Sequence, residues 1–153
     1  MTWWAWLLQL AGLAFLAFSM WLIFTQARRD RTLKPWTLLV ALLGGIVSAL
    51  LFVLFSPSRP PAAALVPLIV VAPILGVGIS LTARLELDGK TILSSQGQWY
   101  AMAWCGFLFA SSLLIIAGQT ASEVAVAIAV FASLGTAGYV LTIYIRYASM
   151  SYR

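Results

Sequence analysis

Five long apolar stretches, none interrupted by a charged residue, dominate this chain of 153 residues. A helix needs about 20 apolar residues to cross about 30 Å of hydrocarbon, because each residue advances it by about 1.5 Å. All five stretches are long enough, and the remaining residues are too few for a separate soluble domain. We therefore expect an all-α membrane protein, a five-span transmembrane helix bundle that forms a single domain over residues 1–153. The predicted spans are Trp3 to Thr25, Trp36 to Phe55, Ala62 to Thr82, Trp99 to Ala117 and Val124 to Ile145.

The composition supports this fold class and removes several classes of function. Hydrophobic residues make up 63% of the chain, and charged residues only 8%. There is no histidine and Cys105 is the single cysteine, so imidazole-held metals and paired-thiol chemistry lack their residues. We expect no catalytic residue, no metal site and no cofactor, and we predict that the protein is not an enzyme. The apolar run after Met1 is too long for a signal-peptide core, so we expect the first span to be retained.

The distribution of basic residues predicts the orientation of the bundle. Lysine and arginine accumulate in the cytoplasmic loops of membrane proteins. In the five-span topology eight basic residues fall on one side and only Arg59 falls on the other. This places the N-terminus outside and the C-terminus in the cytoplasm, as expected for a protein of the bacterial inner membrane. The eight are Arg28, Arg29, Arg31, Lys34, Arg84, Lys90, Arg146 and Arg153.

Tryptophans cluster near the ends of the predicted spans. Amphipathic aromatic rings favour the headgroup level of a bilayer, which indicates membrane anchoring and contact with lipids. Stacking on a ligand is the alternative interpretation of so many indole rings. The anchoring candidates are Trp3, Trp4, Trp6, Trp36 and Trp99.

Small residues recur every four positions on the last span, and this spacing places them on one face of a helix. A shorter small-residue pattern surrounds Gly45 on the second span. Such stripes let another helix approach closely. That helix belongs either to the same bundle or to a partner subunit, and the sequence leaves both alternatives open. The stripe on the last span consists of Ala121, Ala125, Ala129, Ser133 and Ala137.

The third span contains Pro67 and Pro73, which interrupt the ladder of backbone hydrogen bonds and predict a kink. The kink is either structural or lines a binding pocket, in which case Gln9 and Trp104 are candidate pocket groups. Since no charged residue lies inside any span, the usual marks of ion-coupled transport are missing.

A short hairpin is predicted between the third and fourth spans. In the segment RLELDGKTIL, apolar and polar residues alternate on both sides of Asp88-Gly89, the dipeptide typical of a two-residue turn. An isolated hairpin is marginally stable, so we expect something to cover it, such as a partner. Glu86 and Asp88 lie on one face of the first strand. They are the candidate carboxylates of a further functional hypothesis, a metal-dependent enzyme that modifies lipids.

The order of these parts resembles the CcdC-like family of small bacterial membrane proteins. The resemblance rests on an apolar first span, the basic loop QARRDR, the hairpin LELDGKTIL and the tail YIRYASMSYR. It departs from the pattern after the hairpin, where SSQGQ stands in place of basic residues. The resemblance implies an accessory membrane protein and carries no catalytic residues over to this chain.

These features predict a non-catalytic integral membrane protein that acts as an accessory or scaffolding subunit of a larger membrane complex. Its expected partners are lipids and other integral membrane subunits. The alternative is a carrier of small molecules or lipids that uses the kinked third span. Nucleic acid is not an expected partner, because the loop ARRDRTLKP suits anionic lipid headgroups and lacks the larger basic surface that nucleic-acid binding needs.

Overall fold

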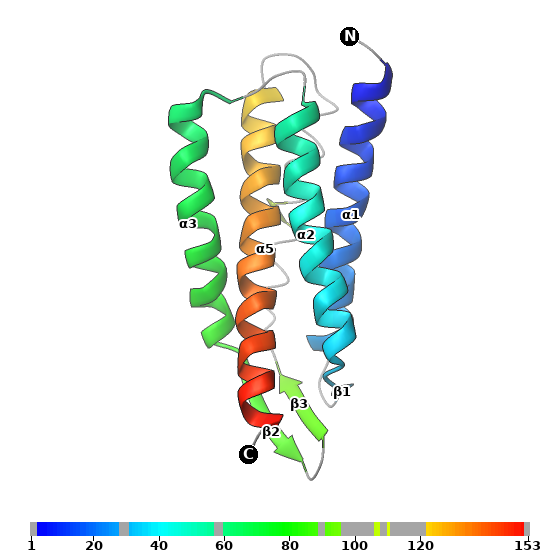
Figure 1. Cartoon of the computed structure of the whole chain (residues 1–153), viewed down its shortest axis with the longest axis vertical. Helices are drawn as coiled ribbons and strands as arrows, with labels where there is room; N and C mark the ends of the chain where they lie inside the picture. Colours follow the sequence, from blue (N-terminus) through cyan, green and yellow to red (C-terminus); the bar gives the residue numbers. More distant parts are fainter. Residues whose placement is uncertain are drawn as a thin grey trace.

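The computed structural model describes residues 3–27, 31–56, 60–88, 91–95, 106, 107, 110 and 122–151. Its described part is a bundle of long helices with a small sheet at one end (Figure 1). The chain ends lie at opposite ends of the bundle, and the sheet shares its end with the C-terminus. The long helices are α1 (Trp3–Ala27), α2 (Pro35–Phe55), α3 (Ala62–Leu81) and α5 (Ser122–Ser151).

All four helices are long and apolar enough to cross a membrane, which confirms the prediction of a membrane helix bundle. They correspond to the first, second, third and fifth predicted spans. The fourth predicted span, 99–117, lies outside the described residues except for Gly106, Phe107 and Ala110. The last helix extends beyond its predicted end at Ile145, and its 30 residues span about 45 Å, more than the hydrocarbon core requires.

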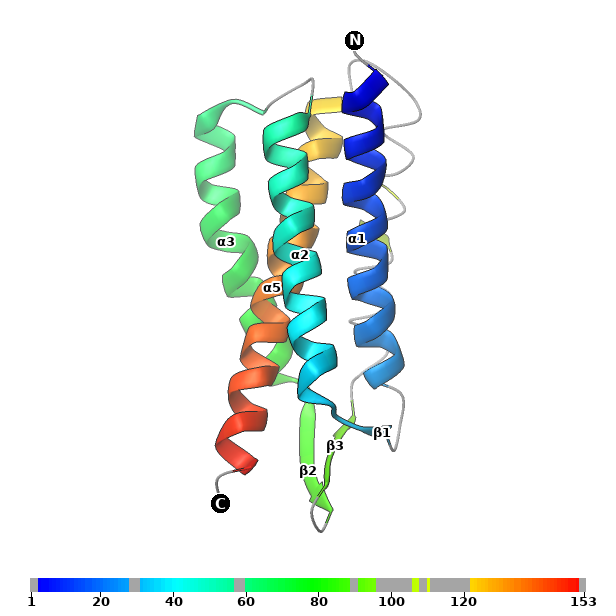
Figure 2. The same cartoon turned by 45° about the vertical axis from the view of Figure 1, so that its right-hand side comes forward.

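Helix α5 occupies the middle of the bundle. It packs against α3 on one side and against α2 on the other, while α1 packs mainly on α2 (Figures 1 and 2). The uncovered apolar side chains of α1, α2 and α3 form the outside of the bundle, as expected where lipid surrounds it. Helix α3 is the most peripheral, since only Ala72, Gly76 and Ser80 are buried on it.

Prolines mark the starts of two helices for a simple reason. The first turn of a helix has no acceptor for its N–H groups, so the missing N–H of proline costs nothing there. Pro35 is the first residue of α2, and Pro61 immediately precedes α3. Pro67 and Pro73 lie inside α3, which nevertheless continues from Ala62 to Leu81.

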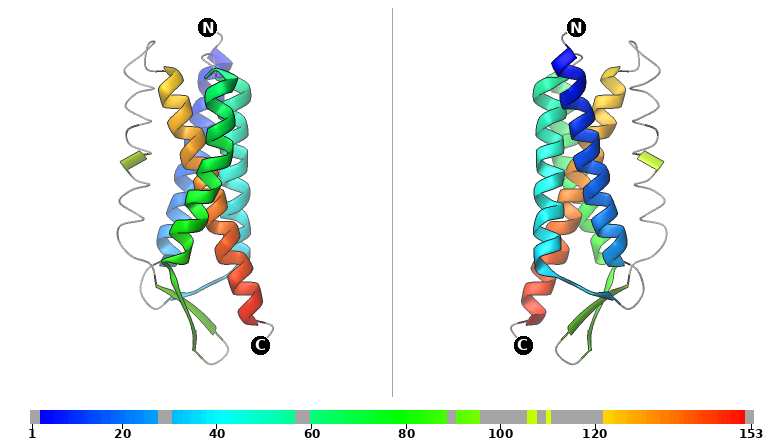
Figure 3. Two further views of the ribbon diagram at one scale, coloured as in Figure 1. Left: turned by 90° about the vertical axis from the view of Figure 1, so that its left-hand side faces the viewer. Right: turned by 90° about the vertical axis from the view of Figure 1, so that its right-hand side faces the viewer.

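Three antiparallel strands form the sheet at the C-terminal end of the bundle. They are β1 (Arg31–Thr32), β2 (Arg84–Asp88) and β3 (Thr91–Ser95), in the order β1-β3-β2. Leu87 is the register partner of Ile92, and Asp88 is the partner of Thr91. Figure 3 shows the sheet below the helices and diverging from the end of α5.

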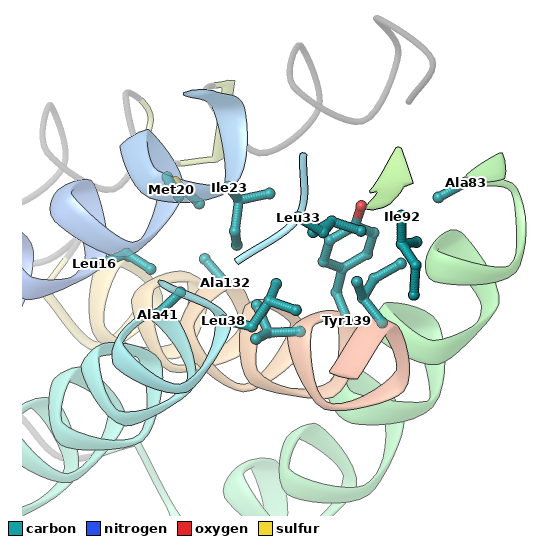
Figure 4. Close-up of a cluster of buried hydrophobic side chains, with 12 residues drawn as sticks. Leu16, Met20, Ile23, Leu33, Leu38, Ala41, Ala83, Ile92, Ala132 and Tyr139 are labelled. Atoms are coloured by element: carbon teal, nitrogen blue, oxygen red, sulfur yellow. The ribbon is translucent and has the colours of Figure 1, made fainter. Parts of the chain in front are cut away.

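The chain itself provides the cover that the hairpin needs, in place of the partner considered in the sequence analysis. β1 comes from the loop after α1 and adds a third strand beside β3. Leu33, Ala83 and Ile92 are buried together with Tyr139 of α5 (Figure 4). The same cluster continues into the bundle through the helix residues around Leu38, so sheet and helices share one core.

Candidate functional site: the helix seams and the sheet

The small-residue stripe of α5 is buried inside the molecule. Ala125, Ala129 and Ser133 are fully covered, and Ala137 is buried as well. Gly45 of α2 faces this stripe, since a Cβ at this glycine would lie 3.1 Å from the Ser133 carbonyl oxygen. The stripe therefore packs against α2, and a partner helix cannot reach this face without displacing α2. Ala121, the first residue of the predicted stripe, lies outside the described residues.

A hydrogen-bond network joins α1, α2 and α5 at the level of Ser133. The Ser48 hydroxyl donates to the carbonyl oxygen of Gly12 at 2.8 Å and lies 3.0 Å from the Ser133 hydroxyl. The Ser133 hydroxyl is 2.7 Å from the carbonyl oxygen of Ala129. Each hydroxyl has one proton to donate, so the two hydroxyls can form only two of these three contacts as hydrogen bonds at the same time. The network links three helices without any charged group.

We expect the Ser48 and Ser133 side chains to be energetically coupled. In a double-mutant cycle of Ser48→Ala and Ser133→Ala, the coupling free energy of unfolding should be about 0.6 kcal/mol and at most about 1.7 kcal/mol, as for other hydrogen bonds between membrane helices. The measurement is equilibrium unfolding of the four proteins in detergent micelles.

Thr142 supplies the matched control for this cycle. Its hydroxyl bonds only within α5, to the Gly138 carbonyl oxygen at 2.9 Å, and lies about 13 Å along the helix from Ser133. Ser48→Ala and Thr142→Ala should therefore be additive within about 0.5 kcal/mol. Additivity of the Ser48 and Ser133 changes would show that the hydroxyl contact contributes nothing.

The seam between α1 and α2 contains two further buried polar groups. The Gln9 amide nitrogen donates to the Ser56 hydroxyl at 3.2 Å, so this candidate pocket group instead holds the start of α1 to the end of α2. The Ser19 hydroxyl is fully buried, has no hydrogen-bond partner among the described residues and contacts Gly44 of α2. A Cβ at Gly44 would meet the Ser19 hydroxyl, so a larger residue fits there only if this hydroxyl turns away.

Backbone meets backbone in the seam between α3 and α5. A Cβ at Gly76 would collide with the Gly135 carbonyl oxygen and lie 2.9 Å from the Tyr139 amide nitrogen. A Cβ at Gly138 would lie 2.5 Å from the carbonyl oxygen of Pro73. The sequence predicts a kink at Pro67 and Pro73, and it does not predict this seam. The backbone of Pro73 lies against Gly138 of α5.

Arg146 of α5 binds the C-terminal end of α3. Its guanidinium nitrogen Nη1 donates to the carbonyl oxygens of Ser80 at 2.9 Å and Ala83 at 3.0 Å. The last carbonyl groups of a helix have no partners within the helix and carry partial negative charge, so a cation stabilises them. From the sequence, Arg146 is predicted only as a determinant of orientation. Its partners are 63 and 66 residues away in the chain, so no local pattern indicates the contact.

The described tryptophans that the sequence predicts as membrane anchors are exposed near the starts of two helices. Trp3, Trp4 and Trp6 are exposed at the start of α1, and Trp36 is 75% exposed near the start of α2, at the sheet end of the bundle. The rings of Trp3 and Trp4 stack with centroids 3.8 Å apart. Trp99 lies outside the described residues, as does Trp104, the other candidate pocket group.

The candidate carboxylates lie on the sheet. Glu86 and Asp88 are both exposed on β2, and Asp88 ends that strand beside the predicted turn, whose Gly89 lies outside the described residues. In the part of the chain that the structure describes, no group of three metal-ligating side chains comes together. The two carboxylates alone do not constitute a metal centre.

The fold and these seams define a polytopic helical membrane protein whose core is closed by small residues and hydroxyl contacts. Comparison with protein-family models, curated proteins and solved structures finds no match for the chain. The resemblance to the CcdC-like family therefore stays a prediction from the sequence.

Proposed function

We propose that this chain is a non-catalytic, five-span protein of the bacterial inner membrane and acts as an accessory or scaffolding subunit of a larger membrane complex. The observation that carries this proposal is the contrast between interior and surface. The seams along α5 bring backbone against backbone at Gly76 and Gly138, whereas the sheet holds exposed charged residues beyond the helices. Such a molecule offers surfaces for binding other proteins.

The five-span topology has support from the positions of the described elements. β3 ends at the sheet end of the bundle, whereas α5 begins at the opposite end (Figure 1). The chain from 96 to 121 has to connect these ends, which agrees with a span at 99–117. Phe107, one of the described residues of that range, contacts Phe131 of α5, with ring centroids 5.6 Å apart.

The proposed orientation has support from the described basic residues. Arg31, Lys34, Arg84 and Arg146 all belong to the sheet end of the bundle, near the ends of the membrane-spanning helices. Basic residues favour the cytoplasmic side. We therefore place the sheet and the C-terminus in the cytoplasm and the N-terminus outside.

The proposal is tested by recovering the protein with its neighbours. We expect a C-terminally tagged full chain, solubilised gently, to co-purify with other membrane proteins in constant stoichiometry, as measured by the mass of the intact particle and the identities of its components. Recovery of the chain alone, or as a homo-oligomer, would contradict the accessory role.

A pair of variants locates the interaction. Arg84→Ala with Glu86→Ala removes exposed charges of β2, and we expect at least a tenfold loss of co-purified partner, equivalent to about 1.4 kcal/mol of binding free energy. Leu43→Ala with Leu50→Ala alters exposed apolar positions of α2 and serves as the control. If both variants recover the same amount of partner, the interface does not include these charged residues of β2.

A further inference from the structure

β2 is an edge strand of the sheet. In the strand order β1-β3-β2, β2 pairs with β3 and has no strand partner on its other side among the described residues. Edge strands expose backbone donors and acceptors, and proteins usually protect them with prolines, bulges or inward-pointing charges. β2 contains no proline, and its register with β3 runs without a bulge from Arg84 to Asp88.

One hydrogen bond determines which backbone groups of β2 point to the free edge. The Leu33 amide donates to the carbonyl oxygen of Ile92 at 2.9 Å, so this carbonyl points toward β1 and away from β2. The pair Leu87 and Ile92 is therefore a non-hydrogen-bonded pair of the antiparallel ladder. The N–H and C=O groups of Leu87 point outward, and by the alternation of a strand so do those of Leu85.

The beginning of this edge already binds a donor from another element. The Ala83 carbonyl oxygen, directly before β2, accepts the hydrogen bond from Arg146. The edge is therefore closed at Ala83 and stays open at Leu85 and Leu87. Two residues of an added strand can pair with these two positions.

The side chains around the open edge define what it can bind. Leu87 is 56% exposed, although its register partner Ile92 is only 6% exposed, so an apolar surface remains uncovered beside the edge. Arg84 and Glu86 lie exposed on the opposite face and form no ion pair with any described residue. An apolar side chain beside Leu87 and a basic side chain opposite Glu86 would complement this strand.

We propose that the free edge of β2 binds an extended segment of a cytoplasmic partner protein by strand addition, with apolar residues alternating with basic ones. The backbone of Leu85 and Leu87 provides the hydrogen bonds, while Leu87 and Glu86 select the side chains. This inference rests on the proposed function, because it assigns the class of partner and places the sheet in the cytoplasm.

A second copy of the chain fits this edge less well. Two copies in one membrane have their sheets on the same side, and β2 is inclined to the long axis of the bundle (Figure 1). When two copies are related by an axis along the membrane normal, their inclined β2 strands therefore cross. Crossed strands do not form the regular ladder of hydrogen bonds that strand addition requires.

The test uses the full chain in phosphatidylcholine nanodiscs and a fluorescent ten-residue peptide of alternating valine and lysine as the probe. A ten-residue peptide of alternating valine and glutamate is the control probe, with the opposite charge. We expect the lysine peptide to bind at least tenfold more tightly in fluorescence anisotropy, even though the net charge of the chain is +5 and favours the acidic peptide at long range. Equal binding, preference for the glutamate peptide or no binding would overturn the proposal.

Leu87→Pro and Leu87→Ala separate the backbone from the side chain. Proline removes the outward N–H while the bonds to β3 remain, because prolines are tolerated at edges on the solvent side. Alanine keeps that N–H. We expect at least a tenfold loss of lysine-peptide affinity in Leu87→Pro and less than a threefold loss in Leu87→Ala. An equal loss of peptide affinity in both variants would show that the Leu87 side chain, and not its backbone N–H, binds the peptide.

The same two variants separate this inference from the proposed function. In the co-purification experiment, a stoichiometric partner that Leu87→Pro releases and Leu87→Ala retains supports strand addition. A partner that both variants retain overturns strand addition and leaves the accessory role intact. A homodimer that Leu87→Pro dissociates would assign the edge to a second copy and overturn the proposal of a partner protein.

Discussion

Replacing Gly76 with alanine is expected to destabilise the protein strongly. The added methyl group would collide with the Gly135 carbonyl oxygen and lie 2.9 Å from the Tyr139 amide nitrogen, both backbone atoms of α5. Backbone of a central helix cannot rotate away as a side chain can, so α3 would have to move outward along its seam. We expect a loss of about 1–3 kcal/mol in the free energy of unfolding, the usual cost of overpacking.

Gly78 provides the matched control for this change. It lies on the same helix two residues away, and a Cβ there would meet no atom of the described residues within 4 Å. Because alanine favours a helix over glycine, Gly78→Ala should be neutral or stabilise by up to about 1 kcal/mol. Both changes are measured by equilibrium unfolding in detergent micelles. Similar effects of the two substitutions would contradict the close packing of α3 on α5.

Replacing Arg146 with alanine is expected to loosen the junction between α3, the sheet and α5. The substitution removes the donor that holds the carbonyl oxygens of Ser80 and Ala83 at 2.9 and 3.0 Å. Hydrogen bonds from charged groups contribute about 1.5–3 kcal/mol, and the partial exposure of this guanidinium favours the lower part of that range. We also expect faster hydrogen exchange of the β2 amides, because the strand begins directly after Ala83.

Arg84 serves as the control for the arginine itself. Its side chain is exposed on β2 and makes no hydrogen bond or ion pair with any described residue, so Arg84→Ala should change the free energy of unfolding by less than about 0.5 kcal/mol. Arg146→Lys keeps the charge but replaces the planar fork by a single ammonium group, and it should recover only part of the stability. Full recovery by lysine would reduce the role of Arg146 to its charge.

Two described residues of the carrier hypothesis lie in contacts between helices. Gln9 was a candidate pocket group, and its amide is bound to Ser56. Pro73 was a candidate kink lining a pocket, and it packs on Gly138. The described residues that the carrier hypothesis required thus hold helices together.

The small-residue stripe of α5 is buried by the chain itself, whereas the edge of the sheet is exposed. Ala125, Ala129 and Ser133 were candidate contacts for a partner helix, but they are buried against the chain's own α2. Leu87 and the backbone beside it are exposed at the edge of β2. Which of these surfaces is buried depends on neighbours far away in the chain. The spacing of small residues does not contain that information.

The sequence by itself determined the fold class and, apart from the C-terminal end of α5, the limits of the described helices to within two residues. A run of apolar residues without charges has to satisfy its backbone internally in a bilayer, and a helix does so within one segment. The alternating segment around Asp88 likewise indicated strands, since the two-residue periodicity is local. These features depend on neighbouring residues and on the solvent, so they are readable without knowledge of the fold.

Only the tertiary structure decided how the helices meet. Lipid is as apolar as leucine, so the hydrophobic pattern of a membrane helix does not reveal which face is buried. The contact of Gly76 with Gly135, the bond from Arg146 to Ser80 and the pairing of β1 with β3 depend on shape and on residues distant in the chain. Close packing selects these contacts. A glycine permits close approach, and a polar group forms a hydrogen bond, only where the fold places another segment of the chain beside it.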